Sequence, residues 1–145
     1  MKAIDYLLLA EWLIEHRSSP DGFRTSVSRV YYAALHTAID LLTNMTVVIP
    51  NNRNKHEVVP DLLEHTNDAD IRYVGNMLSD LRGQRNKADY SLQDPKAETE
   101  ECARLRLKEA RDVVAKLNAC KLDKTKLDKA ALGAAKRASF LFLGK

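Results

Sequence analysis

The sequence predicts an all-α protein, an antiparallel bundle of four to six helices. Its 145 residues are the length of one ordinary domain, enough to bury a hydrophobic core without disulfides or metals. Helix-forming residues dominate the composition, and the alternation of β-branched and polar residues that would indicate strands is rare. Apolar residues recur at helical spacing in segments joined by short loops, which favours antiparallel neighbours.

The first two predicted helices cover residues 2–16 and 23–44. The first is apolar around most of its circumference, as expected for a central helix of the bundle. Residues 17–22, Arg-Ser-Ser-Pro-Asp-Gly, have the composition of a turn. The second helix carries a stripe with steps of four and three residues, formed by Val27, Tyr31, Ala34, Ala38 and Leu41.

A short third helix is predicted over residues 55–65, after a loop at 46–54. Asn67 or Asp68 can cap a fourth helix. The buried stripe of that helix is apolar until an arginine enters it, and it consists of Ile71, Val74, Leu78, Leu81, Arg85 and Ala88. An arginine on a buried stripe is costly unless its charge meets a partner or a ligand.

Asp94 and Pro95 predict the start of a fifth helix that continues to about residue 121. Its buried face comprises Ala103, Leu107, Ala110, Val114 and Leu117. After residue 121 the composition changes to one rich in lysine and apolar residues. We therefore predict a bundle over residues 1–121 and a basic and apolar helical extension over 122–145. Within the extension a last helix is predicted over 130–143, and its apolar end is expected to dock on the bundle or on a partner.

The sequence predicts a cytoplasmic protein with no membrane segment, metal or cofactor. Asp5 and Glu11 interrupt the apolar N-terminal run, so it does not resemble a signal peptide. The two cysteines, Cys102 and Cys120, would lie roughly 27 Å apart on one helix, which excludes a disulfide between them, and no zinc-ligand spacing is present. The net charge of +3 is too small to indicate a nucleic-acid-binding protein by itself.

The first candidate functional cluster lies at the end of the fourth predicted helix. Arg82, Arg85 and Asp89 are three and four residues apart and therefore share one side of the helix. One carboxylate cannot offset two guanidinium groups, and such a pair is suited to binding a phosphate bidentately. The alternative is an ordinary Arg85–Asp89 ion pair with Arg82 in solvent.

The second cluster lies on the second predicted helix, where Arg29, Tyr32 and His36 share a face. Taken alone, Tyr32 and His36 could be satisfied core residues. Together, the two clusters would supply cationic and hydrogen-bonding groups from two long helices.

Three motifs stand in order along the chain: Ser-Arg-Val-Tyr-Tyr-Ala-Ala-Leu-His over 28–36, Lys-His at 55–56, and Arg-Gly-Gln-Arg-Asn-Lys-Ala-Asp-Tyr over 82–90. Together they resemble the motifs of the HEPN family (higher eukaryotes and prokaryotes nucleotide-binding domain). The similarity covers about residues 3–120. It implies a helical bundle that forms a homodimer, with the polar motifs of both chains facing each other across a cleft. Many members are metal-independent ribonucleases of toxin–antitoxin, CRISPR and phage-defence systems. The implied partners are RNA or a nucleotide, and a cognate antitoxin or nucleotidyltransferase.

The chain departs from the catalytic signature that the resemblance implies, an Arg followed after four to six residues by a His. Arg85 and Asn86 fit its start, but Tyr90 stands where the His is expected. A tyrosine is protonated at neutral pH and is a poor base.

Three hypotheses therefore stay open. In the first, the chain is an atypical ribonuclease in which Arg82 and Arg85 hold the scissile phosphate, Tyr90 donates a hydrogen bond, and a histidine or Asp89 is the base. Its candidate catalytic residues are Arg82, Arg85, Asp89, Tyr90 and His36, and its candidate phosphate-binding residues are Arg29, Tyr32, Arg82, Arg85, Asn86 and His56. In the second, the same cluster binds RNA or a nucleotide without catalysis, and in the third the chain is a protein-interaction module that docks through its C-terminal extension.

Overall fold

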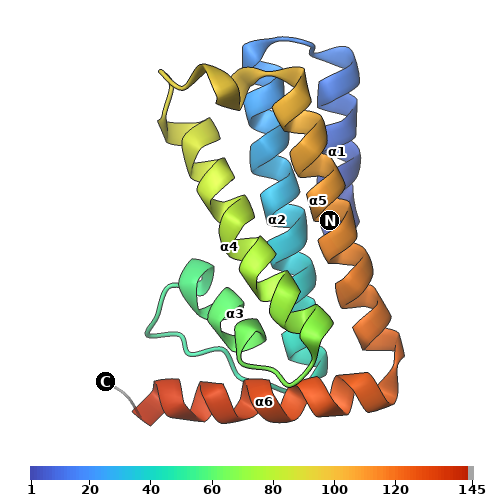
Figure 1. Ribbon diagram of the computed structural model, residues 1–145, viewed down its shortest axis with the longest axis vertical. Helices are drawn as coiled ribbons and strands as arrows, with labels where there is room; N and C mark the ends of the chain where they lie inside the picture. Colours follow the sequence, from blue (N-terminus) through green and yellow to red (C-terminus); the bar gives the residue numbers. More distant parts are fainter. Residues whose placement is uncertain (144–145) are drawn as a thin grey trace.

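The computed structural model describes residues 1–143 and confirms the predicted all-helical antiparallel bundle. Four long helices run side by side in alternating directions, a short helix packs beside α4, and the last helix crosses the ends of the bundle (Figure 1). The elements are α1 (Ala3–His16), α2 (Pro20–Asn44), α3 (Lys55–Glu64), α4 (Ala69–Tyr90), the 3-10 turn η1 (Pro95–Glu98), α5 (Glu100–Leu122) and α6 (Lys124–Leu143).

The central helix is α2, which packs against α1, α4 and α5. Its predicted stripe is confirmed, because Val27, Tyr31 and Leu41 are each at most 1% exposed. The stripe predicted for α4 is confirmed as well, including the arginine within it. The buried residues of that stripe are Ile71, Val74, Leu78, Leu81, Arg85 and Ala88.

The prediction that the first helix is central was wrong. α1 lies at the edge of the bundle and buries only Leu7, Ala10 and Ile14. Its outward face is apolar and exposed, and Ile4, Leu8, Leu9 and Trp12 are 41–58% accessible to solvent. With 25 residues against 14, α2 is long enough to contact all its neighbours, and it takes the central place. An apolar pattern all round a helix does not distinguish a buried helix from one with an uncovered face.

The turn predicted over residues 17–22 is shorter in the structure, because α2 already begins at Pro20. Proline suits the first position of a helix, where its missing N–H has no partner to lose. Gly22, in the first turn, lies against the end of α1, and a Cβ at this position would be 1.9 Å from the carbonyl oxygen of Arg17. The chain therefore reverses within three residues, 17–19.

Caps decide where the next helices begin. The Asp68 side chain accepts a hydrogen bond from the Ile71 N–H at 3.0 Å and starts α4, as one of the two predicted caps. Asp94 and Pro95 start the short turn η1 and not α5, which corrects that boundary. The backbone is extended at Thr99, whose hydroxyl accepts from the Cys102 N–H at 3.1 Å, so α5 begins only after it.

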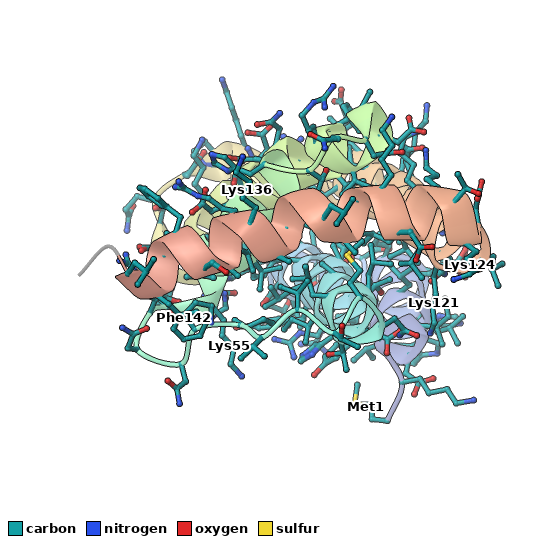
Figure 2. The ribbon with its side chains drawn as sticks, turned by 90° about the horizontal axis from the view of Figure 1, so that it is seen from below. Met1, Lys55, Lys121, Lys124, Lys136 and Phe142 are labelled. Atoms are coloured by element: carbon teal, nitrogen blue, oxygen red, sulfur yellow. The ribbon has the colours of Figure 1, made fainter. Side chains whose placement is uncertain are left out.

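The C-terminal helix α6 begins at Lys124, six residues earlier than predicted, because Asp123 accepts a hydrogen bond from the Lys126 N–H. It runs across the base of the molecule from Lys124 to beyond Lys136, towards Phe142 (Figure 2). Its buried residues are Ala130, Ala134, Ala138 and Leu141, while Phe140, Phe142 and Leu143 are exposed. Positions 144 and 145 of the predicted extension lie outside the described residues.

Three ion pairs join α6 to the rest of the bundle, and two of them are made by Lys126, with Asp68 and Asp70. Lys126 Nζ lies 2.8 Å from Asp68 Oδ2, and Arg137 donates to both carboxylate oxygens of Asp61. Asp68 therefore caps α4 and also holds α6. Among the described residues, no helix is both long enough and apolar enough to cross a membrane.

Arg24 on α2, which the sequence analysis did not single out, holds the end of α4 in place. Its side chain is 10% exposed, and its Nε donates to Glu98 Oε2 at 3.1 Å. Its two Nη groups donate to backbone carbonyls at and after the end of α4, those of Lys87, Ala88, Ser91, Leu92 and Asp94. The last carbonyls of a helix lack intrahelical partners and carry the negative end of its dipole, so a buried guanidinium satisfies both needs.

We expect Arg24→Met to destabilise the protein by about 3 kcal/mol or more, because five carbonyls and the Glu98 carboxylate lose their donor. The measurement is urea unfolding followed by circular dichroism. The matched control is Arg104→Met, an exposed arginine paired with Glu100, which should cost less than about 0.5 kcal/mol. Equal losses in the two variants would contradict this role of Arg24.

Candidate phosphate-binding site

The packing of α2 against α4 brings the two predicted clusters together, and α3 adds a histidine. The site is the arginine–tyrosine cluster, which we define as Arg29, Tyr31 and Tyr32 of α2, His56 of α3, and Arg82 and Arg85 of α4. Ring and charge contacts connect its members across the three helices.

Arg85 lies at the centre of the arginine–tyrosine cluster. Its guanidinium carbon is 5.4 Å from the ring centre of Tyr31, 5.6 Å from that of Tyr32 and 5.9 Å from that of Tyr90. These cation–π contacts stabilise the charge in part. The predicted ion pair with Asp89 exists, but its shortest N–O distance is 3.7 Å, beyond hydrogen-bonding range, for a side chain only 10% exposed.

The alternative of an ordinary Arg85–Asp89 ion pair would require Arg82 to project into bulk solvent. It does not. Its side chain is 29% exposed and lies over the start of α3, where Nη1 donates a long hydrogen bond of 3.5 Å to the His56 carbonyl. The nearest carboxylate is that of Glu57, at 3.9 Å, and it is itself 67% exposed. Solvent screening weakens such a pair.

Arg29 completes a chain of polar contacts from α2 to Asp89. Its Nη2 donates to Ser28 Oγ at 3.1 Å, and Ser28 Oγ donates to Asp89 Oδ2 at 3.2 Å. The guanidinium lies 5.1 Å from the ring centre of Tyr32 and 5.7 Å from that of Tyr6. Asp89 therefore forms an ion pair with Arg85 and is connected to Arg29 by hydrogen bonds through Ser28.

The three arginines of the cluster retain unused hydrogen-bond donors. Within residues 1–143, the buried Nε atoms of Arg29, Arg82 and Arg85 have no hydrogen-bond partner. Buried donors are almost always paired in folded proteins. One further unpaired Nε, that of Arg106, belongs to a guanidinium that is paired with Glu109, so the three in this cluster are set apart by their number and their distant carboxylates. An anion with several oxygens supplies acceptors for these donors, and the phosphate group matches the guanidinium fork.

Tyr31 and His56 form a neutral pair under these charges. The Tyr31 hydroxyl lies 2.6 Å from His56 Nδ1. Burial raises the pKa of Tyr31 to about 12, although Arg85 and Arg82 act against the rise. Burial, followed by the repulsion of Arg85, Arg82 and Lys55, lowers the pKa of His56 below its usual value of 6.5. At neutral pH the phenol therefore keeps its proton, and the imidazole is uncharged.

The other predicted residues lie around this centre. Tyr90 is 74% exposed and covers Arg85 from the end of α4. His36 lies beyond Tyr32, 6.3 Å from its ring centre, and stacks on Tyr6 at 5.6 Å. Asn86 is half-buried, and its side chain makes no hydrogen bond within the described part of the chain. The structure thus brings together Arg29, Tyr32, His56, Arg82 and Arg85, with Asp89 and Tyr90 at the edge.

Sequence reasoning assigned Tyr31 to the core and missed its part in the site. The residue is buried as predicted, at 0% exposure, but its hydroxyl reaches the histidine of α3. A tyrosine on a fully buried stripe needs a partner for its hydroxyl, and this requirement was the available signal. Ser28, which connects Arg29 to Asp89, was part of the quoted motif without an assigned role.

The described residues contain no group of three or more His, Cys, Asp or Glu side chains placed to hold a metal ion.

Comparison with known proteins found no match: no protein-family model matches the chain, and no curated protein or solved structure is significantly similar to it.

We expect Arg85→Met to leave the free energy of unfolding unchanged or to raise it by about 1 kcal/mol, because it removes a buried and incompletely compensated charge. Asp89→Asn should instead destabilise the protein, because it leaves the buried guanidinium without its carboxylate. Urea unfolding of both variants tests this. A loss above about 1 kcal/mol in Arg85→Met would mean that the arginine serves the fold and not a ligand.

Proposed function

We propose that this chain is a HEPN-type protein that binds RNA through the arginine–tyrosine cluster, as a component of a prokaryotic toxin–antitoxin or phage-defence system. The observation that carries the proposal is a cluster of three arginines, each with an unpartnered buried Nε. Arg29 and Arg85 share the ring of Tyr32, and Arg82 lies beside them at the His56 carbonyl. The order and spacing of the two motifs, which resemble those of the HEPN family, support the same assignment.

The geometry suits a phosphodiester better than a carboxylate or an acidic protein side chain. A phosphodiester offers two non-bridging oxygens, which one guanidinium can bind bidentately or two can share. Arg85 and Arg82 supply donors from one side, and Arg29 supplies them from α2. The rings of Tyr31 and Tyr32 exclude water from the charges, which strengthens their attraction for an anion.

The binding experiment is a titration of labelled single-stranded RNA, monitored by fluorescence anisotropy at several salt concentrations. We expect Arg82→Ala/Arg85→Ala to weaken binding by at least tenfold and to lower the slope of log affinity against log salt by about 1–2, since two phosphate-directed cations are lost. The control Arg104→Ala/Arg111→Ala removes two exposed arginines of α5 that pair with Glu100 and Glu11. Equal weakening in both double variants would contradict the proposal.

Metal-independent RNA cleavage is a second candidate function, and the position of His56 favours it. The signature His is absent from α4, but the structure places a neutral imidazole of α3 beside Arg82 and Tyr31. In the tautomer whose Nδ1–H donates to the Tyr31 oxygen, Nε2 has a lone pair that can accept the proton of a ribose 2′-hydroxyl.

The reaction would then be an internal transesterification. The 2′-oxygen attacks the phosphorus while its proton passes to His56, the bond to the 5′-oxygen breaks, and solvent protonates that leaving oxygen. The products are a 2′,3′-cyclic phosphate and a 5′-hydroxyl end. Arg82 and Arg85 stabilise the additional negative charge on the phosphorus oxygens in the transition state.

We expect purified protein to cleave RNA in EDTA, and His56→Gln to lose at least 100-fold in rate while RNA binding is retained. The rate should fall as pH decreases through a midpoint below 6.5, because the surroundings lower the pKa of His56 and only the neutral imidazole accepts a proton. His65→Gln, at the end of α3, is the matched control. Binding without cleavage would leave the non-catalytic RNA-binding function.

The proposal includes two protein partners: a second copy of the chain, and a cognate antitoxin or nucleotidyltransferase. The exposed apolar face of α1 supports a protein-binding surface on that helix, since Leu8 is 58% and Trp12 53% accessible to solvent. A contiguous apolar patch of this kind is typical of an interaction site.

A further inference from the structure

A surface cavity of about 590 Å³ lies next to the arginine–tyrosine cluster and has no role in the function proposed above. It is formed where the first turn of α1, the second half of α2 and the second half of α5 meet. Its walls include Tyr6, His36, Thr37, Asp40, Val114 and Asn118. The volume is that of a site for a small organic group and not for a single ion.

One aromatic ring separates this cavity from the phosphate-binding groups. The Tyr32 ring centre is 5.6 Å from the guanidinium carbon of Arg85 and 6.3 Å from the ring centre of His36. Arg29 bridges the same two regions, because its guanidinium contacts the rings of both Tyr32 and Tyr6. A nucleotide whose phosphate is bound by these arginines therefore has its base, or the adjacent base, within reach of the cavity.

The walls of the cavity combine a flat aromatic surface with hydrogen-bonding groups. Tyr6 and His36 stack on each other, parallel to within 5°, and a planar ring can extend this stack on the other face of the exposed His36. Asp40 contributes a carboxylate that accepts a 2.8 Å hydrogen bond from Lys121 Nζ. A carboxylate has about four acceptor sites, so this bond leaves capacity for further donors. Asn118 offers an amide, which is both donor and acceptor.

We infer that this cavity binds a nucleobase, and guanine in preference to the others, from the RNA whose phosphate the arginine–tyrosine cluster holds. Of the four RNA bases, guanine presents two adjacent donors, N1–H and the N2 amino group, on its Watson–Crick edge. A carboxylate can accept both in parallel, as it accepts an arginine fork. The inference rests on the proposed function, because the phosphate anchors the nucleotide beside the cavity.

The test compares two short single-stranded oligonucleotides, an oligouridylate and the same strand with one guanosine. Both carry 2′-fluoro riboses, which lack the attacking hydroxyl and cannot be cleaved by transesterification. We expect the guanosine strand to bind about tenfold more tightly, since a bidentate base contact contributes that order of discrimination. A strand with one adenosine should resemble the oligouridylate.

Asp40→Asn should reduce the ratio of the guanosine and uridine affinities to about one, because an amide cannot accept from both guanine donors. His36→Ala should lower the same ratio through the loss of stacking. The control Asp112→Asn removes an exposed carboxylate of α5 that pairs with Lys116, and it should leave the ratio unchanged.

The inference is overturned if the wild-type protein binds both strands equally, or if the guanosine preference survives Asp40→Asn. These outcomes are distinguishable from failure of the proposed function. Equal binding that is still lost in Arg82→Ala/Arg85→Ala removes the base site and leaves the phosphate site in place. If neither strand binds, the phosphate site and the base site are both refuted.

Discussion

The hydrogen bonds of Arg24 are the constraint on which the rest of the site depends. This buried side chain of α2 donates hydrogen bonds to the backbone carbonyls at the end of α4 and pairs with Glu98 of η1. It thereby fixes how the last turns of α4 lie on α2, one turn from Ser28 and Arg29. The contacts of Arg85 with Tyr31 and Tyr32 follow from that placement. Arg24 and Arg85 are both buried arginines, but only the first has acceptors for its donors.

These two arginines differ in how their buried charges are compensated. Desolvating a guanidinium costs several kcal/mol, which a full set of hydrogen bonds can offset. Arg85 contacts three aromatic rings and one distant carboxylate instead, so its charge is less fully compensated than that of Arg24. Burial, together with the repulsion of Arg85 and Arg82, lowers the pKa of His56 and favours the neutral imidazole. The same cluster would therefore serve both the proposed anion site and the proposed proton acceptor.

Helical periodicity was sufficient to predict the bundle and the buried stripes of α2 and α4, because burial follows directly from spacing. It failed for α1, whose apolar residues surround the helix and so do not show which face is covered. The convergence of Arg29, Arg82 and Arg85 followed from two motifs on two helices. The pairing of Tyr31 with His56 could not be predicted, since it depends on where α3 docks after a loop. Arg24 was missed for a different reason: its acceptors are mostly backbone carbonyls, which the pattern of side chains in the sequence does not reveal.

The most direct test of the central claim observes the unpartnered Nε–H groups themselves. Their ¹⁵N–¹H resonances can be assigned by NMR and followed while single-stranded RNA is added to the wild-type protein. The account predicts large shifts for Arg29, Arg82 and Arg85 as phosphate oxygens accept their hydrogens, with little change at Arg104, which already donates to Glu100. Shifts confined to exposed lysines and arginines, with the three cluster signals unmoved at saturating RNA, would contradict it.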